Sequence, residues 1–399
     1  MKRFPSAAPD GLVAAILLSF LATAGLFYVN IMAALVTGLI DGLHFTEREA
    51  GFVASANVYG AAFGALISIF FVKRISWRPV AIGLLLTLVT VDLASTFLKT
   101  AQTLIALRFL HGTVGGMLVG TAFSVIARTR VPDRTFGMLL VVQFGLGGLG
   151  LMFLPRLVPV FGTPVLFWAL AAFSIVTLAM VPFLPDYARP KMPAGAVGTQ
   201  PIRWFPLVLA LVSVVLFQSG NMALAAYMIE LGRHYGLQID FVSTVLGFAG
   251  WIGALGSLAV VFIGLRFGRF WPLVIAFIAT VSGNALFHFS AAPGIYAFAN
   301  LETSVTWSFV ISYLLGMCAS FDKGGQTAAM AGFMSKVGLA TGPLTAGLLL
   351  DGQRFGLLIN IAVVALAASA LAALLPAALL DRAARESARV GASLPGVTS

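Results

Sequence analysis

Apolar segments separated by short polar breaks recur along the whole chain. Each segment has about 20 residues or more, enough to cross about 30 Å of hydrocarbon as a helix. Lipid offers the backbone no hydrogen-bond partners, so unbroken apolar runs of this length predict helices rather than strands. The pattern predicts an all-α polytopic membrane protein with twelve transmembrane helices. The predicted helices are 11–40, 50–72, 79–98, 103–128, 136–157, 165–185, 205–230, 241–265, 272–290, 295–318, 325–350 and 356–380.

One polar stretch divides these segments into two sets of six. Residues 186–204, DYARPKMPAGAVGTQPIRW, are rich in Pro and Gly and lack apolar periodicity. We therefore predict two pseudo-symmetric six-helix bundles, 1–185 and 205–381, joined by this stretch as a cytoplasmic linker. A cytoplasmic tail, 382–399, is expected to follow the second bundle.

Composition supports this class and excludes others. Hydrophobic residues make up 60% of the chain and charged residues 10%, whereas soluble domains carry about 25% charged residues. The net charge of +10 comes from short basic clusters between apolar segments, so it reports topology rather than a nucleic-acid partner. A single cysteine, Cys318, excludes a disulfide framework within the chain and a cysteine-rich metal site. No phosphate-loop pattern occurs, so ATP is not the energy source within this chain.

The distribution of Lys and Arg predicts the orientation, because cytoplasmic loops retain positive charge. If the N-terminus is cytoplasmic, most of the 24 Lys and Arg residues fall on the cytoplasmic side. The external side then holds Arg48, Lys99, Arg156, Arg233 and Arg354. We therefore expect a multi-pass protein of the inner (plasma) membrane with both termini in the cytoplasm.

Basic loops follow the second and the eighth predicted helix. The first contains Arg74 and Arg78, and the second contains Arg266, Gly268 and Arg269. These loops resemble the Gly-x-x-x-Asp-Arg-x-Gly-Arg-Arg motif of the major facilitator superfamily, and the resemblance covers almost the full length of the chain. It implies two related bundles that expose a central site alternately to either side of the membrane. The four arginines are predicted as gating-loop residues, with anchoring at the membrane surface as the alternative.

Two further motifs are similar to those of the family, and one position departs from it. Arg108 and Gly112 match an Arg-x-x-x-Gly motif in helix four, and Gly342-Pro343 matches a Gly-Pro motif in helix eleven. By this resemblance, helix four lines the central cavity and Arg108 becomes a binding or coupling cation. The acidic position of the basic-loop motif is occupied by Lys73 in the first copy and by Leu265 in the second.

Four charged residues fall within apolar segments, where a charge requires a partner or a wet cavity. Asp92 and Arg108 lie on consecutive helices at levels that differ by about 3 Å, so the two side chains could pair across the hairpin. This structural pairing and a role of Arg108 toward substrate both remain open. Lys336 lies about 16 Å into its helix, near the bilayer midplane, and Glu302 differs from it in level by about 10 Å. A carboxylate substrate is therefore a candidate counter-ion for Lys336, and a permanent pair with Glu302 is the alternative.

A desolvated carboxylate such as that of Glu302 can take up a proton near neutral pH, as proton coupling requires. A neutral carboxylic acid bonded to a neighbouring helix is the structural alternative. The candidate proton-coupling residues are Glu302 and Asp92, and the candidate substrate-binding residues are Arg108, Lys336, Gln218, Asn221, Asn30 and Trp307. His111 and His288 are expected to be hydrogen-bonded polar groups, and no spacing builds a metal site.

These observations predict a secondary active transporter of a small organic anion, a carboxylate, working by alternating access with proton coupling or exchange. The alternative is a proton-driven multidrug or metabolite efflux antiporter. No nucleophile and base constellation supports an enzyme, and no cofactor is expected. The predicted partners are the solute, protons and the lipid bilayer.

Overall fold

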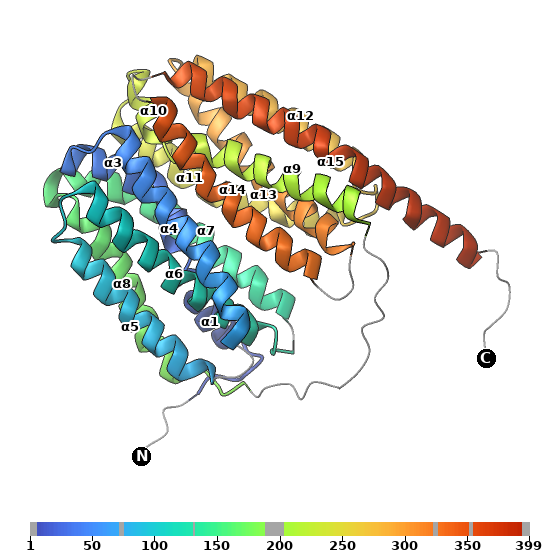
Figure 1. The fold of residues 1–399 in the computed structure, drawn as a ribbon, viewed down its shortest axis with the longest axis horizontal. Coiled ribbons are helices and arrows are strands. Elements are labelled where there is room, and N and C mark those ends of the chain that lie inside the picture. Colours follow the sequence, from blue (N-terminus) through green and yellow to red (C-terminus); the bar gives the residue numbers. More distant parts are fainter. Residues whose placement is uncertain are drawn as a thin grey trace.

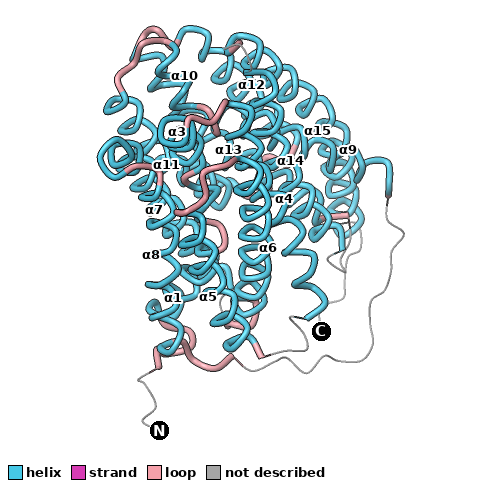
Figure 2. Tube along the Cα trace, turned by 60° about the vertical axis from the view of Figure 1, so that its left-hand side comes forward, coloured by secondary structure: helices cyan, strands magenta, loops and turns pink. Residues whose placement is uncertain are grey.

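A computed structural model describes residues 6–71, 76–130, 132–187, 203–321, 326–350 and 354–392, without the side chains of residues 71, 133 and 387–392. Within these residues the regular structure is α-helix with two short 3₁₀ helices, and no strand is present (Figure 2). The predicted all-α class is therefore confirmed.

The helices follow one another in two sets (Figure 1). The first set is α1 (Leu12–Ala24), α2 (Phe27–Asn30), α3 (Met32–Leu43), α4 (Glu47–Phe71), α5 (Trp77–Ser95), α6 (Ala101–Ile126), α7 (Pro132–Phe161), α8 (Pro164–Met180) and η1 (Val181–Phe183). The second set is α9 (Trp204–Ala225), α10 (Met228–His234), α11 (Ile239–Ile263), α12 (Phe270–Ala285), η2 (Leu286–Phe289), α13 (Pro293–Ala319), α14 (Gln326–Leu350) and α15 (Phe355–Ala392).

Eleven helices of the described residues are long and apolar enough to cross a membrane. The remaining crossing, the first, is assembled from α1, α2 and α3, which gives the twelve that the sequence predicts. The predicted linker 186–204 lies mostly outside the described residues, so its structure and the exact division of the chain stay predictions. The last helix was expected to end near residue 380 but continues to Ala392, because its final turns contain the strong helix formers Ala, Arg and Glu.

The first crossing was expected to be one helix over residues 11–40, and this was wrong. The helix ends at Gly25 and is interrupted again at Ile31, where φ is −111° and ψ is 20°. Gly25 lies against the backbone of Gly115 in α6, and a Cβ at residue 25 would come within 2.7 Å of a side-chain methyl group of α6. The seventh crossing is interrupted in the same way at Tyr227, where φ is −115° and ψ is 20°. The first helix of each bundle is therefore broken, which is a visible part of the pseudo-symmetry.

Small residues four positions apart on α4 and α6 let the two helices approach closely. A Cβ added at Gly60 would lie 2.9 Å from the backbone nitrogen of Thr113, and one added at Gly116 would lie 2.9 Å from the backbone carbonyl carbon of Ala61. The two helices therefore touch backbone to backbone. Across the bundle boundary, α4 packs against α14 and α7 packs against α11.

Candidate functional site

A cavity of about 440 Å³ lies between the two bundles, and we call it the central cavity. Its volume falls within the range of small-molecule sites, roughly 300–1,000 Å³. The residues that line it come from α2, α3 and α7 of the first bundle and from α9, α10, α11, α13 and α14 of the second. Its larger polar side chains are Asn30, Gln143, Gln218, Asn221, Asn300 and Trp307. Among the described residues that line it, none is charged.

Two amides from the first bundle pair at one wall of the cavity. The side chain of Gln143 donates from Nε2 to Oδ1 of Asn30 over 3.0 Å, and Asn30 donates back to the backbone carbonyl of Gln143 over 3.4 Å. Asn30 is the last residue of α2, so the interruption of the first crossing positions this amide. The predicted candidate Asn30 therefore lines the cavity.

A second chain of hydrogen bonds starts at residues of the second bundle that line the cavity. The indole of Trp307 donates to Oε1 of Gln218 over 2.6 Å, and Nε2 of Gln218 donates to the hydroxyl of Ser335 over 2.7 Å. Ser335 precedes Lys336 in α14. The chain thus connects two predicted candidates in the cavity with the helix turn that carries Lys336.

Asn221 and Asn300 present acceptor groups. Each donates its amide N–H to the backbone carbonyl four residues earlier, over 3.0 Å to Phe217 and 2.9 Å to Tyr296. A backbone carbonyl can only accept, so the orientation of both amides is fixed. Their side-chain oxygens accept no hydrogen bond from the described residues and remain available to a solute that donates.

Lys336 is half-buried in α14, and no hydrogen bond or ion pair joins its ammonium to any described residue. It does not line the central cavity, but Leu339, one turn further along, does. Residues three apart on a helix share a face. The Lys336 ammonium is therefore a cation near the cavity without an acidic partner in the described residues.

Arg108 lies away from the cavity, in contrast to the expectation that it lines it. The side chain is fully buried and donates to Oδ1 of Asp92 over 2.8 Å. It also donates to the backbone carbonyl of Val91 over 3.2 Å and to the hydroxyl of Ser95, and it stacks on Phe167 at 5.0 Å. The helix hairpin brings Asp92 and Arg108 to one level, so the structural pairing that the sequence left open is present.

Glu302 also lies outside the central cavity. Its carboxylate lies against Gly283 of α12, and neither oxygen has a hydrogen-bond partner among the described residues. Asn300, Ser304 and Trp307 line the cavity from the same helix, but at 100° per residue they occupy the opposite face. The described residues contain no ion pair between Glu302 and Lys336, in agreement with the mismatch in their levels.

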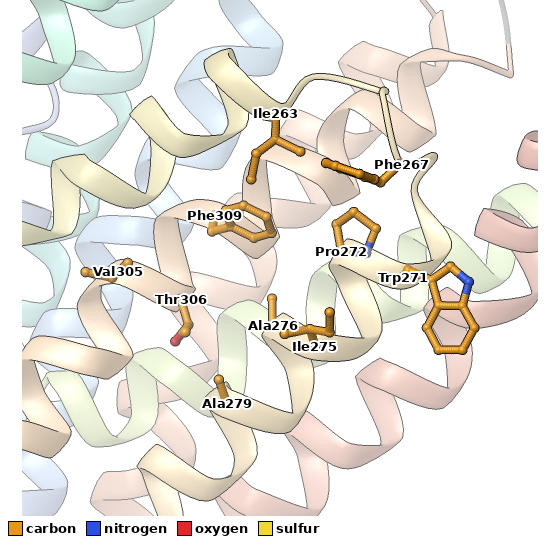
Figure 3. A pocket seen from close by; sticks show the side chains of 10 residues that line it. All are labelled: Ile263, Phe267, Trp271, Pro272, Ile275, Ala276, Ala279, Val305, Thr306 and Phe309. Atoms are coloured by element: carbon orange, nitrogen blue, oxygen red, sulfur yellow. The ribbon is translucent and has the colours of Figure 1, made fainter.

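A second, apolar groove of about 640 Å³ opens on the outside of the second bundle between α11, α12 and α13 (Figure 3). Phe267, Trp271 and Ile275 line it with more than 60% of their side-chain surface exposed. Exposed apolar side chains of this size on membrane-spanning helices contact lipid. The groove is therefore not the candidate solute site.

The hydrogen bonds between the bundles lie toward one end of the molecule, which we call the closed end. There Arg233 of α10 pairs with Asp41 of α3 at 2.8 Å, and Arg156 of α7 pairs with Asp240 of α11 at 3.1 Å. Figure 1 shows α3 and α10 together at this end, opposite the end where α1 begins and α15 finishes. The sequence indicates Arg156 and Arg233 only as external charges and does not identify their partners.

Two contacts deeper in the molecule mark the inner limit of the hydrogen bonds that join the two bundles. Tyr59 of α4 bonds Thr341 of α14 at 2.9 Å, and Trp251 of α11 donates to the carbonyl of Gly145 in α7 over 3.0 Å. Both lie about halfway along their helices. Beyond them, no hydrogen bond joins the bundles in the described part of the chain. The central cavity is thus sealed toward the closed end.

The predicted gating arginines contact only their own bundles. Arg78 donates to the carbonyl of Leu184 over 2.5 Å, Arg269 donates to Ser320 over 2.8 Å, and Arg266 is exposed. Arg74 lies outside the described residues.

An acid from outside the motif, on the last helix, completes the second basic loop. The carboxylate of Asp381 in α15 accepts from the backbone N–H groups of Arg269 and Phe270 over 2.8–2.9 Å, where α12 begins. Burial lowers the pKa of Arg269, and the Asp381 charge acts against this shift. An acid from the last helix therefore caps this loop, which explains how the motif tolerates Leu265 at its own acidic position. No group of three metal-ligating side chains occurs in the described residues.

Two six-helix bundles around a polar cavity that is sealed at one end define a transporter of the alternating-access class. The chain belongs to the major facilitator superfamily, whose model matches residues 15–335. It is therefore a secondary transporter and an integral membrane protein that crosses the bilayer many times.

Solved structures agree with this fold. The nucleoside transporter NupG superimposes with a TM-score of 0.69 at 13% identity over 93% of this chain and 99% of that chain. A point mutant of NupG gives 0.71 at 15% identity over 92% and 98%. A bacterial homologue of the human lysosomal transporter Spinster, inward-facing and unoccupied, gives 0.64 at 11% identity over 93% and 96%. At these identities the likeness concerns the fold. Comparison with curated protein sequences returned no match.

Proposed function

We propose that this transporter moves a small organic anion, a carboxylate, by alternating access coupled to protons or to exchange. The observation that carries the proposal is Lys336, whose ammonium has no acidic partner in the described residues. Leu339, one turn away along α14, lines the central cavity, and one turn rises about 5 Å, within reach of a lysine side chain. A carboxylate would supply both the charge and the hydrogen-bond acceptors that this ammonium lacks.

The other polar groups narrow the solute further. The side-chain oxygens of Asn221 and Asn300 are free to accept hydrogen bonds, so they favour a solute that also carries hydroxyl or N–H groups. Asn30, Gln218 and Trp307 add uncharged contacts at the walls of the cavity. A hydroxy- or amino-carboxylate small enough for about 440 Å³ combines these features.

Protons are proposed to act through Glu302 and Asp92, acids within the membrane-spanning segments that each have a buried carboxylate oxygen without a hydrogen-bond partner in the described residues. We place the protein in the inner membrane with both termini in the cytoplasm, on the basis of the Lys and Arg distribution. The closed end then faces the exterior, and the conformation described above is inward-facing.

A second candidate, a proton-driven efflux antiporter for apolar compounds, is favoured by the rest of the cavity lining. Phe144, Met222, Met228 and Leu246 contribute to it. Methionine side chains adapt to solutes of different shape. In this function Glu302 would carry protons and Lys336 would have no ligand.

A thermal-shift panel on purified protein tests the proposal, because a solute that binds the folded state raises its melting temperature. The panel contains simple carboxylates, hydroxy- and amino-carboxylates, nucleosides, sugars and lipophilic cations. We expect carboxylates to stabilise the native protein, Lys336→Ala to lose this shift, and Lys336→Arg to regain part of it, because a planar guanidinium does not reproduce a compact ammonium. Lys99→Ala, which changes an exposed lysine, is the matched control and should keep the full shift.

Two results would overturn the proposal. One is a shift with lipophilic cations and none with any carboxylate, which would support the efflux function. The other is a permanent pair between Lys336 and Glu302. In that case Lys336→Ala would destabilise the protein, and Lys336→Ala with Glu302→Ala would restore stability while carboxylate binding persists.

A further inference from the structure

Five polar side chains form a buried cluster inside the first bundle, which we call the His111 cluster. It comprises Asn57 of α4, Asp92 and Ser95 of α5, and Arg108 and His111 of α6. His111 is 4% exposed, and Asp92 and Arg108 are fully buried. The Asp92–Arg108 pair explains the two charges, but it does not explain why an imidazole lies beside them.

The hydrogen bonds of Asn57 determine which nitrogen of His111 carries a proton. Nδ2 of Asn57 lies 3.2 Å from the backbone carbonyl of Arg108 and 2.7 Å from Nδ1 of His111. The carbonyl can only accept, so the atom that approaches it must be the amide nitrogen. An amide nitrogen can only donate, so Nδ1 of His111 must be its acceptor and carries no proton.

The other ring nitrogen completes the assignment. Nε2 of His111 lies 3.2 Å from Oδ1 of Asp92, a carboxylate oxygen that only accepts. His111 is therefore neutral, with its proton on Nε2, in the conformation with the sealed closed end. An imidazolium would place an N–H on Nδ1 directly against the N–H of Asn57.

Proton uptake by His111 consequently requires the Asn57 amide to turn over. The turned amide places Oδ1 against the new N–H, and its nitrogen leaves the Arg108 carbonyl. One bond between α4 and α6 is lost, at the point where the two backbones touch. A Cβ on Gly112 of α6 would lie 2.7 Å from the carbonyl carbon of Asn57.

Residues beside Asn57 and His111 connect this contact between α4 and α6 to the closed end and to the central cavity. Tyr59, two residues beyond Asn57 on α4, makes the bond to Thr341 that marks the inner limit of the closed end. Tyr28 of α2 packs its ring 5.9 Å from that of His111, and the next residues of α2, Val29 and Asn30, line the central cavity.

We propose that His111 is a proton-binding positioning residue, and that its protonation, through the Asn57 amide, weakens the conformation in which the closed end is sealed. This proposal rests on the proposed proton coupling, but it concerns the protein without a bound solute. The titratable or charged groups that face His111 in the described residues are Asp92 from α5, Arg108 from α6 and Tyr28 from α2. Nε2 of His111 already carries a proton that points at Asp92, so the imidazole receives its second proton at Nδ1.

The tautomer is tested directly on the native protein in nanodiscs by nitrogen NMR of ¹⁵N-labelled histidine. The signal lost in His111→Gln assigns the residue. We expect the neutral form with the proton on Nε2 at pH 8, and a second N–H on Nδ1 as the pH falls toward 5. A neutral form with its proton on Nδ1, or no titration of His111 between pH 8 and 5, would overturn the proposal.

The proposed effect of His111 on the closed end is tested without any solute. Spin labels are placed at Val160 of α7 and at Gln238, immediately before α11, in a Cys318→Ala background. Both positions are exposed near the closed end, so the labels report the distance between the two bundles there. We expect the short-distance population to fall at least threefold between pH 8 and pH 5. His111→Gln should remove this response, and Asn57→Asp should move its midpoint to higher pH, because a carboxylate accepts from Nδ1–H without turning over.

Two controls separate this proposal from the proposed function. His288 bonds Asn360 at 2.9 Å at an exposed site of the second bundle, so His288→Gln should leave the response intact. Glu302→Gln should also leave it intact, even if it abolishes proton-coupled uptake. A response that survives in His111→Gln, or one that is absent from the native protein, would overturn the role of His111. Failure of the carboxylate panel would leave this experiment unaffected.

Discussion

Two cations within the membrane-spanning segments meet opposite environments. The guanidinium of Arg108 bonds Asp92, the Val91 carbonyl and Ser95, whereas the ammonium of Lys336 bonds none of the described residues. A buried charge is tolerated when its partners replace water. Arg108 has those partners within its own bundle and needs no solute. Lys336 therefore carries the substrate proposal, although the two residues were equal candidates in the sequence.

The carboxylate of Glu302 leads to a prediction of its own. Both of its oxygens are buried without a hydrogen-bond partner in the described residues, and an unpaired buried polar group is costly. Glu302→Gln keeps the shape and removes the titration. We expect it to abolish the stimulation of solute uptake by a proton gradient while leaving ligand-induced thermal shifts and the melting temperature undiminished.

The matched control for this variant is Glu230→Gln. The Glu230 carboxylate pairs with Arg233 at 3.3 Å, so replacing this carboxylate with the amide of Gln should lower the melting temperature slightly. Stimulation of uptake by a proton gradient in Glu302→Gln, to the native extent, would assign Glu302 a purely structural role.

At the level of helices, the interruptions in the first and seventh crossings have a functional consequence. They place Asn30 at the end of α2 and Met228 at the start of α10, and both side chains line the central cavity. An uninterrupted helix would present a continuous side-chain surface there. The short helices α3 and α10 then carry Asp41 and Arg233 to the closed end.

The ion pair between α3 and α10 gives a prediction at this level. Asp41→Asn removes a bond between side chains that are 35% and 42% exposed, and exposed pairs contribute about 0.2–1 kcal/mol. We expect the ratio of molecules whose closed end is sealed to molecules in which that end has opened to fall about 1.4- to 5-fold, since RT is about 0.6 kcal/mol. Distance distributions from spin labels at Val160 and Gln238 measure this ratio.

An ion pair elsewhere in the molecule provides the control. Arg130 and Asp10 pair at 3.4 Å within the first bundle, so Asp10→Asn should leave the ratio unchanged. Exchange of the charges in Asp41→Arg with Arg233→Asp should restore it. A ratio insensitive to Asp41→Asn would show that packing of α4 on α14 and of α7 on α11 suffices for closure.

For the whole molecule, the basic loops predict that both termini and the linker 186–204 are cytoplasmic. Cysteines introduced at Ser6 and Ala196 in a Cys318→Ala background should resist an impermeant thiol reagent applied to intact cells. Both should react after the membrane is opened. Lys99→Cys, in a loop predicted to be external, is the positive control, and labelling of Ser6 or Ala196 from outside would invert the topology.

Several features of the site could be predicted from local rules. Asn30, Gln218, Asn221 and Trp307 are polar residues in apolar helices, and all four line the central cavity. Helical rise placed Asp92 and Arg108 at similar levels, because 1.5 Å per residue fixes the level of each side chain in a short hairpin, so their pairing was one of the two interpretations that the sequence left open. In contrast, the partners of His111 lie on α4 and α5, and no sequence spacing indicates how α4 packs on α6.

The sequence by itself determined the helical class, the twelve crossings and the six-plus-six division, because lipid forces each apolar segment to satisfy its own backbone. Only the tertiary structure decided which way each helix faces. A helix that is apolar all round has no polar stripe to distinguish lipid from protein, so the sequence could not decide whether the face with Glu302 or the face with Asn300 meets the central cavity. The pairs that close the molecule, such as Arg156 with Asp240, join residues from different bundles. Their meeting depends on how the two bundles dock, which no local pattern encodes.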